Sequence, residues 1–186
     1  MKKAKLLLST FFALIAVTVL VSFRYAESNT YSADDLKQMG VDWQRAKAYT
    51  QEYLNASTDE IVKFKPTVEM RTFGQQMLHI AEANYNMASM ATGKASPVAW
   101  GSLEKSDKYA TKAELTKVVM DSYDFVIAAA KEMDPQKMGE TVTIFKFDMT
   151  RALALGKVFE HQTHHRGQTT VYLRLKGVKP PDEKLF

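Results

Sequence analysis

Apolar residues recur every three or four positions in four stretches of this 186-residue chain, a spacing that places them on one face of a helix. The stretches run approximately over residues 32–55, 72–92, 111–134 and 148–177. No series of alternating strands accompanies them. Helices that each have one apolar face bury it most simply against one another, so the pattern predicts an all-α protein and a four-helix bundle.

Residues that favour helix ends support these boundaries. Thr72-Phe73-Gly74-Gln75 and Thr111-Lys112-Ala113-Glu114 have the form of capping boxes, which start helices. Ser32, followed by two acidic residues, is an N-cap candidate for the first helix. Gly93 and Asp134-Pro135 predict the ends of the second and third helices.

Three connections between the helices differ in character. Ala56–Met70 contains Pro66 and predicts a loop with at most a short helical turn. Lys94–Tyr109 has no sustained period and predicts a long surface loop that borders any cavity in the bundle. Thr141–Phe147 is β-branched and aromatic, so we expect a strand-like crossover without a partner strand.

The N-terminus has the form of an export signal. Lys2, Lys3 and Lys5 precede an apolar run, Leu6–Phe23, and Ala26-Glu27-Ser28 offers a small-x-small cleavage pattern. We therefore predict a signal peptide at 1–28, or a membrane anchor if it is not cleaved, since the apolar run is long for a signal. The domain would occupy 29–186, in an extracytoplasmic compartment: periplasmic, secreted or membrane-anchored.

Charge and cysteine content exclude several classes of function. Four of the 25 basic and one of the 21 acidic residues lie in 1–28, which leaves 21 basic and 20 acidic residues in the domain. A nearly neutral domain does not predict a nucleic-acid partner. The chain has no cysteine, which excludes disulfides, thiolate ligands and a cysteine nucleophile.

Three of the four histidines, His161, His164 and His165, lie in the last helical stretch. His161 and His165 are four residues apart, so their rings project from one helix face within about 40° of each other. Neutral imidazole is a common ligand of divalent metals, and two rings at this spacing can share one ion. The alternative is a pair of buried, hydrogen-bonded histidines with a packing role.

The helical wheel places this pair on the inward face. The same stripe holds Ala154, Val158, Gln168, Tyr172 and Leu175. His79, at the inward edge of the second helix, can supply a third ligand, and bundles often hold metals between facing helices. We therefore predict a site of His79, His161 and His165. His164 lies about 60° from His161 and is expected at the surface or in a supporting position.

Other polar residues have two interpretations each. Glu82, one turn after His79, is the carboxylate best placed to act as a general base, or else a solvated helix residue. Gln168 could support the metal ligands or bond a buried backbone group. Arg166 and Arg174 could orient an anionic substrate or complement the helix dipole. Zincin proteases carry a glutamate directly after the first histidine of their helix motif, as the general base. Here Gln162 follows His161, which excludes a zincin mechanism.

Two segments resemble a known family. His161-x-x-x-His165-Arg166-Gly167-Gln168 with the following Val171–Pro181 is similar to the C-terminal signature of the DinB family. Lys65–Ala81, which contains His79, is similar to the family's helix-two motif. The resemblance spans the predicted mature domain. It implies a bundle with an up-down-down-up course and a divalent metal, zinc or nickel, on three histidines that correspond to His79, His161 and His165.

The resemblance also bounds the function. DinB-like proteins include thiol S-transferases, a maleylpyruvate isomerase and members without a known reaction, and they often form homodimers. Three neutral histidines leave a coordination position open, as in catalytic metal sites. We expect a metal-dependent enzyme, hydrolase-like or transferase-like, for an unidentified small-molecule substrate. The alternatives are a non-catalytic metal-binding or interaction module and a structural bundle without metal.

Overall fold

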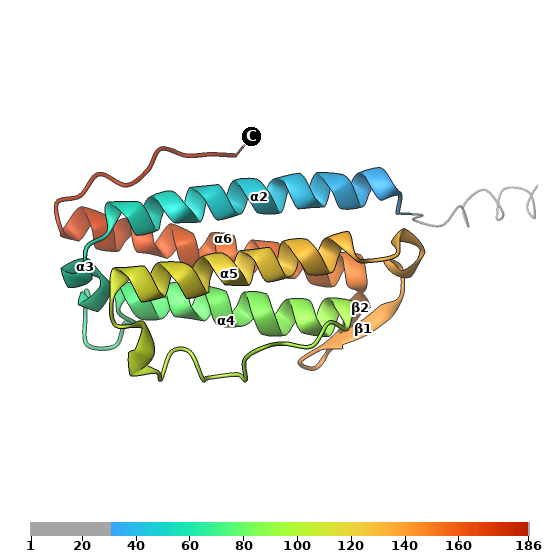
Figure 1. Cartoon of the computed structure of the whole chain (residues 1–186), viewed down its shortest axis with the longest axis horizontal. Coiled ribbons are helices and arrows are strands. Elements are labelled where there is room, and N and C mark those ends of the chain that lie inside the picture. Colours follow the sequence, from blue (N-terminus) through green and yellow to red (C-terminus); the bar gives the residue numbers. More distant parts are fainter. Residues whose placement is uncertain (1–30, 186) are drawn as a thin grey trace, which may run out of the picture. The chain divides into compact units, whose positions relative to one another are not determined.

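The computed structural model describes residues 31–185, in which helices dominate (Figure 1). The four long helices are α2 (Ala33–Ala56), α4 (Phe73–Thr92), α5 (Lys112–Lys131) and α6 (Arg151–Leu175). Helix α4 packs against α5 and α6, and α2 packs against the same two helices. The helical class predicted from the apolar pattern is confirmed for this part of the chain.

The predicted caps form where the sequence placed them, with one difference. Thr72 and Gln75 make a reciprocal capping box at the start of α4, and Gly93 ends that helix with φ 84°, a left-handed conformation that suits glycine. At α5, the Thr111 hydroxyl accepts the Glu114 N–H and donates to the Glu114 carboxylate. The second half of the predicted box is therefore a bond between the two side chains.

The core lies between the four helices and is filled by aromatic and aliphatic side chains. Its largest fully buried members include Trp43, Phe73, Met77, Tyr123, Leu155 and Tyr172. The Trp43 ring contacts those of Tyr123 and Phe159 edge-on, with centroids 5.8 and 5.3 Å away. Burying each such ring contributes roughly 2–3 kcal/mol, so Trp43→Ala should destabilise this layer.

The connections position the segments around α4. The short helical turn expected in 56–70 is α3 (Asp59–Lys63). The long loop after α4 ends in the 3-10 helix η1 (Asp107–Tyr109). Figure 1 shows this loop returning along α4, so that α4 and α5 both begin at the end of the molecule where α3 lies.

The expectation of an unpaired strand is wrong. Strand β1 (Thr141–Ile144) pairs antiparallel with β2 (Phe147–Thr150), and Ile144 lies opposite Phe147. The two-residue turn between them contains Phe145 at φ 56° and no glycine or asparagine, so the usual hairpin signal is missing. Helix α6 begins directly after this hairpin, with Thr150 as its N-cap.

The end of α5 also differs from the prediction. The helix ends at Lys131, and Asp134 instead caps a separate 3-10 helix, η2 (Pro135–Lys137). Among the helices of residues 31–185, none is long and apolar enough to cross a membrane. The predicted signal segment lies outside the described residues, so the domain boundary after residue 28 stays a prediction.

Candidate metal centre

The three histidines singled out by the sequence come together between α4 and α6. One ring nitrogen of each of His79, His161 and His165 lies within 4.8 Å of the others. The His165 ring centroid is 4.5 Å from that of His79 and 4.5 Å from that of His161. The predicted convergence of three imidazoles from two helices is therefore confirmed. His164 is exposed, and its Nε2 accepts a hydrogen bond from Gln168 at 2.8 Å.

The inward face of α6 follows the predicted stripe except at its last position. Ala154, Val158 and Tyr172 are fully buried, whereas Leu175 is 59% exposed. At this level of the bundle the core contacts come from Tyr172 and Leu173. A helix turns about 100° per residue, so Leu175 lies roughly 110° from the middle of that pair and faces solvent.

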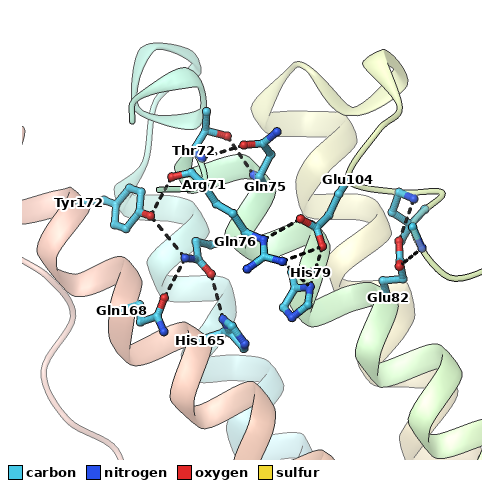
Figure 2. A network of polar contacts seen from close by, with 12 residues as sticks. Arg71, Thr72, Gln75, Gln76, His79, Glu82, Glu104, His165, Gln168 and Tyr172 are labelled. Carbon is cyan, nitrogen blue, oxygen red and sulfur yellow. Dashed lines mark hydrogen bonds and ion pairs between the residues drawn. The ribbon is translucent and has the colours of Figure 1, made fainter. Parts of the chain in front are cut away.

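Glu104 orients His79, and Arg71 in turn holds Glu104; both residues lie outside α4. The Glu104 carboxylate, from the long loop, accepts the His79 Nδ1–H at 2.6 Å and the Arg71 Nε–H at 2.7 Å (Figure 2). Because Nδ1 carries the proton, the lone pair of His79 lies on Nε2 and is free for a metal. Arg71 Nη2 is also 3.4 Å from His79 Nδ1, but both atoms carry protons, so this contact is not a hydrogen bond.

Glu104 remains ionised in this arrangement. Burial alone would raise its pKa, but the hydrogen bonds donated by His79 and Arg71 and the positive charge of Arg71 outweigh burial and hold the pKa at about 2. A carboxylate that fixes the tautomer and direction of a ligating histidine also increases the basicity of that ligand. Glu104 thus has the position of a supporting group for a metal ligand.

His165 is oriented by a chain of neutral groups. Its Nδ1–H donates to Gln76 Oε1 at 2.9 Å, which leaves Nε2 as the free lone pair. The Gln76 amide in turn donates to Gln168 Oε1 at 2.8 Å (Figure 2). Tyr172, 3.4 Å from the same amide, donates to the Arg71 carbonyl. Of the two interpretations of Gln168, the structure supports the one in which it assists a histidine of the candidate site, since Gln168 bonds Gln76 and Gln76 bonds His165.

His161 has no such support. Its Nδ1 is buried and has no hydrogen-bond partner among the described residues. Leaving a buried polar atom unpaired costs about 1–3 kcal/mol. Of the three histidines, this is therefore the one whose polar atoms are least satisfied by the protein alone.

The electrostatics favour neutral rings. Burial lowers the pKa of His161 to about 4, and the nearby His79 adds to the effect. Burial, followed by the proximity of His161, lowers the pKa of His165 to about 3. Both rings are therefore uncharged at neutral pH, the state in which imidazole binds metals. Three imidazole nitrogens could hold a divalent metal ion, and hydrogen-bonding partners such as those of His79 and His165 commonly orient metal-binding histidines.

Two expectations about charged residues are wrong. Glu82 is neither solvated nor free to act as a base: it is 2% exposed, and its carboxylate accepts the backbone N–H groups of Gly101 and Leu103. Arg166 is buried, donates to Gln162 Oε1 at 2.8 Å, and lies over the Tyr49 ring at 4.4 Å. It faces α2 in mid-helix, where it can neither reach a substrate at the triad nor complement the end of the helix.

The sequence missed the groups that orient the histidines. Gln76 lies three residues before His79, on the same side of α4, so helical spacing could have suggested it. Glu104 lies in an irregular loop, and no local pattern distinguishes it from the other acidic residues of the chain. Only the return of that loop along α4 brings it to His79.

Comparisons with known proteins show the family of this chain. The DinB family matches residues 29–184, and the chain belongs to that family. It is 26% identical over 145 residues to the uncharacterized protein YrdA of Bacillus subtilis (strain 168), a match covering 75% of this chain and 81% of YrdA.

Solved structures show the same fold. A DinB-like protein from Bacillus cereus ATCC 10987 superposes with a TM-score of 0.60 at 24% identity, over 81% of this chain and 97% of that one. The DinB-like protein YjoA of Bacillus subtilis superposes with a TM-score of 0.62 at 18% identity, over 80% and 96% of the two chains. At these identities the likeness concerns the fold alone.

Proposed function

We propose that this DinB-family protein is an exported, metal-dependent enzyme that holds zinc or nickel on His79, His161 and His165. The observation that carries the proposal is the meeting of three imidazoles, two of them held by partners that leave Nε2 free. The up-down-down-up course belongs to the same proposal. It is supported by the shared starting end of α4 and α5 and by the long connection between them.

The chemistry follows from the donor set. A bound divalent ion would act as a Lewis acid and lower the pKa of a group that coordinates it at the open position. The protein contributes the geometry: Glu104 and Gln76 fix two ligating rings, and burial keeps His161 and His165 unprotonated. This suits a hydrolase-like or transferase-like reaction on a small molecule.

One observation favours the alternative, a metal-binding or interaction module without catalysis. Of the two carboxylates nearest in sequence or space to His79, Glu82 anchors the loop and Glu104 is engaged by His79 and Arg71. Neither is free to accept a proton from a substrate. An enzyme built on this site would rely on the metal and the substrate's own groups for proton transfer.

Metal analysis tests the site. Protein purified without chelators should contain about one zinc or nickel per chain, and His79→Ala, His161→Ala and His165→Ala should each lose most of it. His164→Ala is the matched control, because this neighbouring histidine is exposed and outside the triad. A metal content far below one per chain, or one that His161→Ala leaves unchanged, would remove the basis of the proposal.

A substrate screen separates enzyme from module. Metal-loaded wild type and His165→Ala are compared on ester, amide and thiol-transfer donors. Equal rates on all of them would leave the module. The intact mass of the protein recovered from the extracytoplasmic fraction tests export, and a chain beginning at Asn29 is expected after cleavage. Size-exclusion chromatography tests whether this chain forms the homodimer that the family resemblance implies.

A further inference from the structure

Two aromatic side chains from different segments meet on the surface near α4. Trp100, in the long loop, and Phe145, at the tip of the β1–β2 hairpin, have ring centroids 5.5 Å apart. They are 45% and 61% exposed. Single exposed apolar residues are common, but two exposed aromatic rings brought together from separate segments form a surface on which a ligand can bind. We call Trp100 and Phe145 the aromatic pair.

The loop ties Trp100 to the level of the metal centre. Gly101 and Leu103 donate their backbone N–H groups to Glu82, which lies one helical turn after His79 on α4. Glu104, next along the loop, bonds His79 itself. The loop therefore runs along α4 from the level of Glu82 to that of His79 (Figure 2). Trp100 stands immediately before this tethered stretch.

The hairpin brings Phe145 to the same two helices. Strand β1 contacts both α4 and α6, and β2 contacts α6. These are the helices that carry His79, His161 and His165. The aromatic pair and the triad thus lie along one α4–α6 pair, joined by the loop that supplies Glu104.

The backbone at Phe145 is unfavourable for this residue. Its φ of 56° suits glycine or asparagine and is unfavourable for a residue with a bulky side chain. Burial does not offset this cost, because the Phe145 ring is mostly exposed and packs against the partly exposed ring of Trp100. Strain held at an exposed aromatic side chain points to a use of the ring outside the fold.

We propose that the aromatic pair is the apolar subsite of the metal centre. The substrate would carry an aromatic or extended apolar group next to the polar group that binds the metal. This inference rests on the proposed function, since it assigns the substrate class of that site. Trp and Phe rings offer a large rigid contact area with little rotamer entropy to lose, and ring–ring contacts add to the area term.

Hydroxamates provide the test, because the group ligates zinc whatever substituent it carries. Zinc-loaded full-length protein is titrated with acetohydroxamate and with phenyl hydroxamates whose ring is attached directly or through one or two methylenes. At least one phenyl compound should bind about tenfold more tightly than acetohydroxamate. It should also change the fluorescence of Trp100. The other tryptophan, Trp43, is fully buried and reports only on the fold.

The variants isolate the subsite. Trp100→Ala and Phe145→Gly should each lose most of the phenyl advantage and keep the affinity for acetohydroxamate. Phe145→Gly relieves the positive φ, so it should fold at least as well as wild type in thermal melts. Val41→Ala is the control, since Val41 is an exposed apolar residue on α2, a helix that carries none of the three histidines.

The outcomes separate the two proposals. If acetohydroxamate does not bind zinc-loaded protein, or binds His161→Ala equally, the metal centre is wrong and the subsite falls with it. If acetohydroxamate binds through the triad but no phenyl compound gains affinity, only the subsite is wrong. The subsite is equally wrong if the gain survives in both Trp100→Ala and Phe145→Gly.

Discussion

Glu104→Gln tests whether the loop carboxylate tunes the metal centre. The substitution keeps the size of the side chain and removes its charge. In the native protein one carboxylate oxygen accepts the His79 Nδ1–H at 2.6 Å and the other accepts the Arg71 Nε–H at 2.7 Å. An amide offers one oxygen and one NH2 group, so one of the two donors would face another donor.

The expected magnitude follows from these contacts. A hydrogen bond to a charged partner contributes about 1.5–3 kcal/mol, against about 0.5–1.5 kcal/mol for a neutral one. The difference at His79 is about 1–1.5 kcal/mol, so the Kd for zinc should rise about tenfold, within the range typical of groups that orient a ligand. The free energy of unfolding of the metal-free protein should fall by less than about 1 kcal/mol, because Arg71 and Glu104 are both partly exposed.

Competition with a chromophoric chelator at fixed neutral pH measures this Kd. Glu132→Gln is the matched control, because Glu132 is an exposed carboxylate that bonds Lys94 away from the centre. Glu104→Gln should weaken zinc binding and Glu132→Gln should not. A zinc affinity of Glu104→Gln within twofold of the control would show that the carboxylate does not act on the metal through His79.

Three further predictions concern the buried polar groups. Gln76→Leu leaves the buried His165 Nδ1–H without an acceptor, so the free energy of unfolding of the metal-free protein, measured with urea, should fall by about 1–3 kcal/mol. The zinc affinity should fall about tenfold or more. Gln51→Leu is the control, and equal values for the two variants in both measurements would contradict this prediction. Arg166→Ala should lower the free energy of unfolding in urea by about 2–4 kcal/mol, because Arg166 packs on Tyr49 and donates to Gln162. Arg174 is exposed, so Arg174→Ala should change the free energy of unfolding by less than about 0.5 kcal/mol. Similar losses in the two variants would refute the structural role of Arg166. Burial raises the pKa of Tyr123 to about 12, above the value of about 10 in the unfolded chain. The contribution of the neutral Tyr123 hydroxyl to stability is therefore complete below pH 10 and is lost as the pH rises from about 10 towards 12. Between pH 8 and 11 the free energy of unfolding of Tyr123→Phe should fall less than that of wild type, and an equal fall would argue against the raised pKa of Tyr123.

The sequence alone determined the helices and the histidines that meet. Apolar periodicity and capping residues act within a few positions of the chain, so they located α4 from Thr72 to Gly93 correctly. The spacing of His161 and His165 fixed their common face before any fold was known. The hairpin escaped because its turn lacks the glycine or asparagine on which such predictions depend.

The tertiary structure alone decided how those histidines are held. Glu104 lies 25 residues from His79 in sequence, and Gln76 lies 89 residues from His165. The burial of Arg166 and Glu82 likewise depends on neighbours from other segments. Hydrogen bonds and burial depend on distance in space, whereas a sequence pattern records only distance along the chain. The sequence could therefore name the histidines of the candidate site, and the folded chain had to supply the groups that orient them.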